Sequence, residues 1–210
     1  MPKETFFNLP EQKRARVIEA ALDEFAAYPY HKARITAIAD QAGIAKGSFY
    51  QYFADKKDLF KYIADLIVNK KLEYLNHDMM LNKDKYGFFE LLHELYLSGF
   101  RFAKENPRLI DIANNLLNNK ELQRELWNDY EDQSFDYFQL LLKEGLAKGE
   151  LDPTIDTALV SRLLTGINYS LGDILYKGKD GKIDLDDESG LIETIDKMLA
   201  FIKNGIKKRE

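Results

Sequence analysis

Apolar residues recur at spacings of three and four positions along most of the chain, which is the pattern of amphipathic helices. Near the start, the pattern predicts a helix from about Pro10 to just before Pro29, with an inner face made by Val17, Ile18, Ala21, Leu22 and Phe25. A short helix over residues 35–42 follows, and Gly43 ends it because glycine readily adopts the left-handed conformation of a helix exit. A third helix begins directly after this turn.

The same periodicity continues to the end of the chain, and strand patterns are nearly absent. The further helices that we expect run from the cap Asp55 to about Met79, from Phe88 to about Asn106, around Ile110 to Leu117, from Leu122 to Gly149, from Ala158 to about Tyr176, and from about Leu191 to Ile206. The loop at residues 178–182 has the composition of an exposed turn. We therefore predict an all-α fold of about nine helices.

Composition narrows the class of protein. The 210 residues include no cysteine, which excludes disulfides, thiol catalysis and cysteine-based zinc sites. No run approaches the roughly 20 apolar residues of a membrane span, and the first residues show no signal peptide. We therefore expect a cytoplasmic protein.

The distribution of charge neither supports nor excludes nucleic-acid binding. The formal net charge is −5, but residues 1–60 carry nine Lys/Arg and eight Asp/Glu, and residues 61–210 carry 21 and 27. The first region is therefore at +1 and the second at −6. A case for DNA binding must rest on the positions of individual charges.

Residues 38–53 hold the most specific pattern of the chain. Two short helices meet across Gly43, Ile44 fills the angle between them, and Phe49 with Phe53 fixes the second of them against the first helix of the chain. The opposite face of the second helix is left free, and we expect on it Lys46, Ser48, Tyr50, Gln51 and Tyr52. This face combines one cationic side chain with hydroxyl and amide groups, which can bind phosphates and the edges of bases. A recognition helix presents such groups to a major groove.

Together with residues 55–60, this run resembles the DNA-binding signature of the tetracycline-repressor (TetR) family over about residues 12–62. The resemblance implies nine or ten helices, with a helix-turn-helix head at residues 1–56. It further implies a helical body at residues 57–210 that binds an effector and dimerises.

The resemblance also implies roles for individual residues. It places four near bases or the adjacent backbone, namely Lys46, Gly47, Ser48 and Gln51, and three at phosphates, namely Tyr50, Tyr52 and Lys56. The chemistry agrees with this division, because a glutamine can read adenine through two hydrogen bonds whereas a tyrosine hydroxyl or a lysine suits a phosphate. Further phosphate candidates at the start of the first helix are Lys13, Arg14 and Arg16.

The chain departs from the family pattern at two helix starts. Many members carry Thr or Ser where this chain has Ala33 and Arg34, and a Ser where it has Ala45. The loss of a hydroxyl cap costs about 1 kcal/mol. We expect Thr36 or Ser48 to supply part of the missing function, and we count Thr36 among the DNA-binding residues.

The body carries many aromatic residues, which form either plain core or the wall of a pocket. Binding pockets are apolar with a few polar groups. The candidate effector-binding residues are Tyr96, Phe100, Trp127, Tyr130, Phe138, Asn168 and Tyr169. The effector that such a set favours is small and apolar or aromatic.

The last two helices offer more apolar surface than one body needs, so we expect them to form a homodimer as a four-helix bundle. The predicted interface residues are Leu163, Gly166, Ile167, Leu171, Ile195, Leu199 and Ile202. The alternative is that both helices pack only within their own chain.

Other classes of function find little support in the sequence. Glu90 and His93 have the spacing of a di-iron helix, but the chain has no second copy of it, and residues 180–184 fit a calcium loop poorly. We expect no metal, no cofactor and no enzymatic activity.

The sequence predicts a repressor that binds a roughly palindromic DNA operator as a homodimer and is released when an effector shifts its heads from a separation of about 35 Å. The alternatives are a helical-bundle enzyme and a protein-binding co-activator of the same fold.

Overall fold

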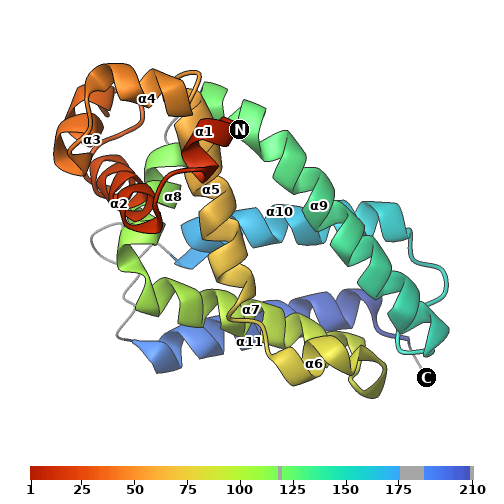
Figure 1. The fold of residues 1–210 in the computed structure, drawn as a ribbon. Coiled ribbons are helices and arrows are strands. Elements are labelled where there is room, and N and C mark those ends of the chain that lie inside the picture. The colour runs from red at the N-terminus through yellow and green to blue at the C-terminus, as the bar shows by residue number, and fades with distance from the viewer. Residues whose placement is uncertain (118–119, 176–186, 209–210) are drawn as a thin grey trace. The chain divides into compact units, whose positions relative to one another are not determined.

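The computed structural model describes residues 1–117, 120–175 and 187–208, except for the side chains of residues 80, 114, 116, 117, 120–129 and 169–175. The named secondary-structure elements of the described residues are all helices (Figure 1), which confirms the all-α prediction. The helices are α1 (Glu4–Phe7), α2 (Glu11–Ala27), α3 (Ile35–Ala42), α4 (Lys46–Tyr52), α5 (Lys56–Leu72), α6 (His77–Leu81), α7 (Phe88–Glu105), α8 (Pro107–Leu117), α9 (Lys120–Ala147), α10 (Thr157–Leu175) and α11 (Glu188–Ile206), with a 3₁₀ turn at Lys83–Lys85.

Two elements differ from the prediction. The helix expected to reach Met79 ends at Leu72, and α6 begins separately because the Asn76 side chain accepts the Met79 amide at 3.2 Å and caps a new helix. The short helix α1 was not predicted, and its Phe6 is fully buried. Within the described residues, none of the helices combines the length and apolar character that a membrane crossing requires.

The chain divides into two compact units. Unit 1 comprises residues 1–73 and 105–126, and unit 2 comprises residues 74–104 and 127–210. The expected boundary at residue 56 differs from this division, because α5 and α8 belong with the head.

In unit 1, α5 and α8 are held to the first helices by burial and by polar contacts. The buried side chains of α5 are Leu59, Phe60 and Ile63. Arg108 of α8 pairs with Glu19 at 2.8 Å and Asp23 at 2.7 Å on α2. The Asn115 side chain of α8 donates at 3.0 Å to the carbonyls of Phe25 and Ala26.

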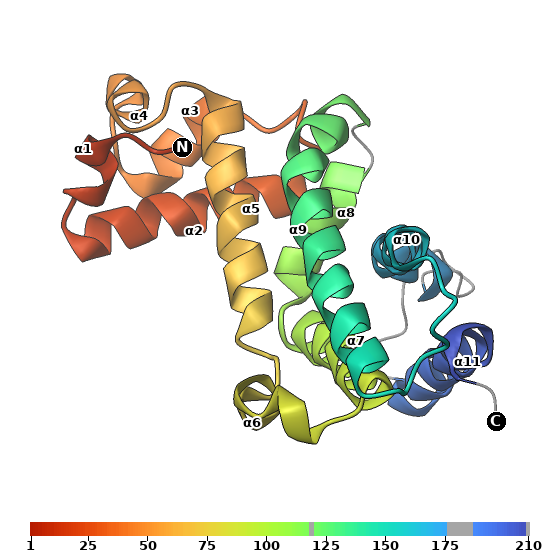
Figure 2. The same ribbon diagram turned by 90° about the vertical axis from the view of Figure 1, so that its right-hand side faces the viewer.

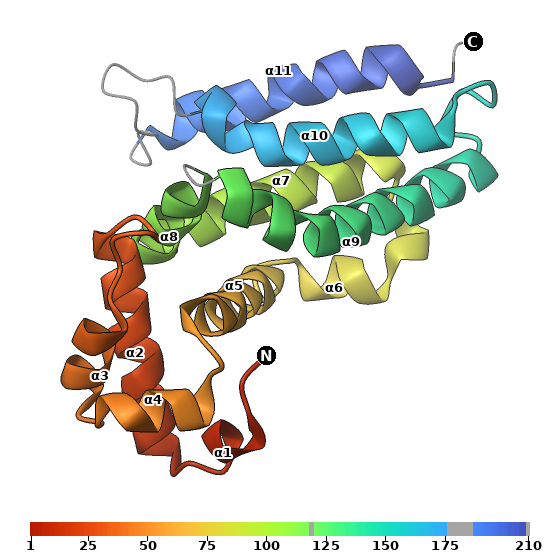
Figure 3. The ribbon, with the colours of Figure 1, turned by 90° about the horizontal axis from the view of Figure 1, so that it is seen from above.

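In unit 2, α7, α9, α10 and α11 surround one apolar core. Figures 2 and 3 show α10 and α11 side by side, and they run antiparallel. The Asp152 amide donates to the Ile206 carbonyl at 2.9 Å, which ties the end of α11 to the segment before α10. The buried core residues are Phe88, Leu91, Leu92, Tyr96, Phe100, Phe138, Leu141, Leu142, Leu151, Leu164, Leu191, Ile195, Leu199, Ile202 and Ile206.

Candidate nucleic-acid interface

The turn between α3 and α4 depends on Gly43. Its φ of 66° lies in the left-handed region, which a residue with a Cβ adopts only at a cost. Its amide donates to the Asp40 carbonyl at 3.2 Å, and the Ile44 amide donates to the Ala39 carbonyl at 3.0 Å. This paired capping ends α3, and the buried Ile44 fills the angle between the helices.

The inner face of α4 anchors the helix in unit 1. Phe49 and Phe53 are fully buried with ring centroids 5.4 Å apart, and Ile38 and Ala42 of α3 are buried as well. The helix can therefore rotate little about its axis, and its other face is defined by packing.

Most of the predicted DNA-binding residues lie on exposed surface of these two helices. The exposed ones are Thr36, Lys46, Gly47, Tyr50 and Gln51, and Ser48 is half-buried. Tyr50 is a large aromatic residue with 44% of its surface exposed, so burial does not account for it. A Cβ on Gly47 would meet no atom within 4 Å, so the fold does not require a glycine there.

The prediction that Tyr52 lies on the free face is wrong. Only 6% of the residue is exposed, and its ring packs 6.1 Å from that of Phe6. Tyr52 follows Phe49 by three positions and therefore shares its inner face. The helix α1, which the sequence did not reveal, covers it.

The prediction that Lys56 holds a phosphate is not supported. Its Nζ donates to the carbonyls of Tyr30 at 2.7 Å and Ala33 at 2.8 Å, and it lies 4.5 Å from the centre of the Tyr30 ring. Burial lowers the pKa of Lys56, and the nearby Glu24 partly offsets this. The lysine therefore ties α5 to the loop between α2 and α3.

Helices α3 and α4 begin without a side-chain cap from a hydroxyl group. Neither Arg34 before α3 nor Ala45 before α4 forms a side-chain cap. The buried Glu24 accepts the Arg34 amide at 2.8 Å instead, which the sequence pattern did not indicate. The predicted cap Asp55 of α5 is confirmed, because its carboxylate accepts the Asp58 amide at 2.8 Å.

The basic residues at the start of α2 differ in their surroundings. Arg14 is half-buried and donates to the Phe7 carbonyl at 3.0 Å, so part of its guanidinium is already engaged. Lys13 is half-buried and Arg16 is exposed.

The described candidate effector residues of unit 2 lie in its core or are half-buried. Tyr96, Phe100 and Phe138 are buried in its core, while Tyr130 and Asn168 are half-buried. The side chains of Trp127 and Tyr169 lie outside the described residues. The hydroxyl of Tyr96 has no hydrogen-bond partner among the described residues, and burial raises its pKa. Within the part of the chain that the structure describes, the hydroxyls of Ser161 and Thr165 on α10 are also buried without a hydrogen-bond partner, and the sequence did not predict either residue as a site residue.

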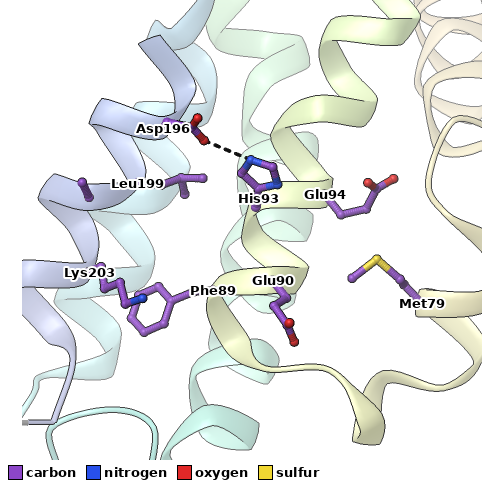
Figure 4. Close-up of a pocket in the computed structure, with 9 residues that line it drawn as sticks. Met79, Phe89, Glu90, His93, Glu94, Asp196, Leu199 and Lys203 are labelled. Carbon is purple, nitrogen blue, oxygen red and sulfur yellow. Dashed lines mark hydrogen bonds and ion pairs between the residues drawn. The ribbon is translucent and has the colours of Figure 1, made fainter. Parts of the chain in front are cut away.

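The described residues of unit 2 form a groove and a smaller pocket. The first, of about 500 Å³, is a groove lined from α6, α7 and α11. Figure 4 shows His93 of α7 directed at Asp196 of α11, 3.1 Å apart, and Lys203 beside the Phe89 ring, 5.5 Å from its centre. The second, of about 340 Å³, lies between α9 and α10 and is lined by Glu131, Asp132, Phe135, Asp136, Arg162 and Thr165.

Glu90 and His93, which have the spacing of a di-iron helix, make other interactions in the structure. Glu90 accepts the Gly87 amide at 2.8 Å and so caps α7, while His93 pairs with Asp196. The described residues contain no group of three or more potential metal ligands. The calcium-loop pattern at residues 180–184 lies outside the described residues.

The predicted dimer residues fall into two groups. Leu163, 57% exposed, and Gly166 lie on the outer face of α10, whereas Ile167 is half-buried and the Leu171 side chain lies outside the described residues. On α11 the prediction is wrong, because the inner stripe packs into the core of its own unit. These buried residues are Ile195, Leu199 and Ile202. The outer surface of α11 instead presents Phe201, 78% exposed.

Comparison with known proteins places this arrangement in one family. Residues 17–63 match the family model "Bacterial regulatory proteins, tetR family", and residues 86–207 match "Tetracyclin repressor-like, C-terminal domain". A TetR family regulator from Chloroflexus aurantiacus is 33% identical, each chain fully covered, with a TM-score of 0.67.

Two relatives carry names that refer to fatty acids. The fatty acid metabolism regulator protein of Bacillus subtilis is 26% identical over 160 residues, 74% of this chain and 81% of that protein. The fatty acid degradation regulator FadR from Bacillus halodurans is 25% identical over 91% of this chain and 96% of its own, with a TM-score of 0.67. On the two family models and the full-length match, this chain belongs to the TetR family of DNA-binding transcriptional regulators.

Proposed function

We propose that the protein is a homodimeric repressor that binds a roughly palindromic operator through α4 and releases it when unit 2 binds a small apolar or aromatic effector. The observation that carries the DNA-binding part of this proposal is the exposed face of α4. Tyr50 and Gln51 are exposed there, while buried phenylalanines anchor the opposite face of the helix. We expect the protein in the cytoplasm, where this target lies.

Tyr50 and Gln51 have separable roles in this proposal. Gln51→Ala is expected to cost about 1–3 kcal/mol of discrimination at one base pair per half-site, because a bidentate contact to an adenine is lost. Tyr50→Phe is expected to weaken binding to operator and scrambled duplex alike, because a phosphate contact carries no sequence information. Titration of both variants against both DNAs checks this. Equal losses for Gln51→Ala on the two DNAs would remove its base-reading role.

Gly47 provides a test in which stability and DNA binding move in opposite directions. A glycine inside a helix costs about 0.5–1 kcal/mol relative to alanine, and the site has open space for a Cβ. Gly47→Ala is therefore expected to raise the free energy of unfolding while weakening operator binding, because the methyl group would meet the DNA backbone. Denaturant titration and a binding titration measure the two effects. Unchanged operator affinity would show that the DNA does not approach this position.

The connectivity of the chain suggests how an effector acts. Helix α8 belongs to unit 1 through its contacts with α2, but it is joined on either side to α7 and α9, which contribute to the core of unit 2. A ligand that changes the positions of α7 and α9 is therefore expected to displace α8, which is bonded to α2. If the protein has one state that binds the operator and one that does not, a ligand that favours the second state lowers operator affinity.

Unit 2 has features of a site for a largely apolar ligand. Its core is apolar, and the hydroxyls of Tyr96, Ser161 and Thr165 are buried without a hydrogen-bond partner among the described residues, so a polar group of a ligand could bind them. Since two relatives are named for fatty acid regulation, acyl compounds are the first class to test. We expect a fatty acid or its thioester to release the protein from its operator in a gel-shift titration, whereas a short acid such as acetate does not.

A further inference from the structure

The end of α4 is completed by a segment far from it in the sequence. A helix ends with carbonyl oxygens that no later amide of the same helix can reach. In α4 all four of these carbonyls have donors, and three of them come from the segment at residues 3–5. The bonds are from the Phe53 amide to Phe49 (2.9 Å), from Lys3 Nζ to Tyr50 (2.8 Å), from the Thr5 hydroxyl to Gln51, and from the Lys3 amide to Tyr52 (2.8 Å).

Phe6 holds this segment in place. It is fully buried, and its ring centroid lies 4.8 Å from that of Phe53 and 5.4 Å from that of Tyr62 on α5. The donors of Lys3 and Thr5 are therefore fixed by a core contact. This contact distinguishes the segment from a loose tail that touches the helix by chance.

The position of the bonds bears on DNA reading. Helix α4 has seven residues, and helices this short are unstable by themselves in water. Tyr50 and Gln51, whose side chains are exposed for DNA, lie in its last turn, and their own carbonyls are the ones that the segment binds. A frayed last turn would let these side chains sample many positions, and ordering them on binding would weaken affinity.

We propose that Lys3, Thr5 and Phe6 form a positioning segment that keeps the last turn of the recognition helix in the geometry that reads the operator. The inference rests on the proposed placement of Tyr50 and Gln51 at the DNA. Deletion or substitution of the segment reduces operator recognition without removing any group that contacts a base.

The test compares Lys3→Met with Thr5→Val, which removes both side-chain donors, with a control, Lys3→Arg with Thr5→Ser, which keeps them. In the full-length protein, hydrogen exchange of the α4 amides is expected to rise about tenfold in the first variant while α2 amides are unchanged. Operator affinity is expected to fall about tenfold, and affinity for scrambled duplex less, with an unchanged salt dependence. The control is expected to match the wild type.

Several results would overturn the proposal. One is unchanged exchange of α4; another is faster exchange with full operator affinity. Equal losses on both DNAs, with the slope of log affinity against log salt reduced by about 0.9, would show that Lys3 itself contacts a phosphate. If the double variant unfolds, the single variant Thr5→Val replaces it in the test, because it keeps both Lys3 hydrogen bonds. It is expected to give a smaller rise in α4 exchange and a smaller loss of operator affinity. A wild-type protein that prefers no operator would contradict the placement of Tyr50 and Gln51, but the exchange measurement would still test the capping.

Discussion

Leu159→Arg combined with Leu163→Arg is expected to give monomers whose two units remain folded. Both leucines are more than half exposed, at 55% and 57%, and they lie one turn apart on the outer face of α10, followed by the exposed Gly166. Arginines can therefore be accommodated in a single chain. In a dimer that pairs α10 and α11 across a two-fold axis, the same arginines would bring four like charges into a desolvated contact.

Loss of the dimer is expected to weaken DNA binding strongly. Two linked heads gain about 10²–10⁴ in affinity over one head, so operator affinity is expected to fall by this factor. Sedimentation measures the assembly, and a binding titration measures the loss. The matched control is Leu140→Arg on α9, where a leucine of the same unit is 48% exposed. A double variant that sediments as a dimer would place the interface elsewhere.

Lys56→Met is expected to lower the free energy of unfolding by about 2–3 kcal/mol, because two charge-assisted hydrogen bonds to backbone carbonyls are lost. The carbonyls of Tyr30 and Ala33 would then be left without these donors in a partly buried setting. Methionine keeps most of the apolar stem, so the change isolates the ammonium group.

The same variant decides between two roles for Lys56. If the lysine is structural, the folded variant binds DNA with an unchanged salt dependence. A phosphate contact would instead reduce the slope of log affinity against log salt by about 0.9. Denaturant unfolding and salt titrations distinguish these outcomes, with the exposed Lys32→Met as the control. Wild-type stability in Lys56→Met would contradict the structural role.

The head could be predicted well from the sequence because its signals are local. Gly43 needs a left-handed φ, and Phe49 with Phe53 marks the inner face of α4, so the turn and the anchored helix follow from a few neighbouring residues. Tyr52 was misplaced although its spacing from Phe49 already indicated burial. Helix α1 was missed because a single buried phenylalanine does not establish a periodic pattern.

The body was harder to predict because its contacts are distant in sequence. A stripe on α11 does not say whether it faces its own chain or a partner, and Ile195 proved to be core while Phe201 faces outward. The small hydroxyls Ser161 and Thr165, four positions apart in an apolar stripe, were a local signal for buried polar groups that could have been noticed. The association of α8 with α2 involves Arg108 and Asn115, whose partners lie more than eighty residues away.

The most direct test of the account is footprinting of the protein on the DNA beside its own gene. The account predicts protection of two symmetric half-sites, centred about 10–10.5 base pairs or a multiple of this apart, that disappears as salt is raised. Protection that is no stronger than on scrambled DNA of the same length at low salt would contradict the claim that α4 reads an operator there.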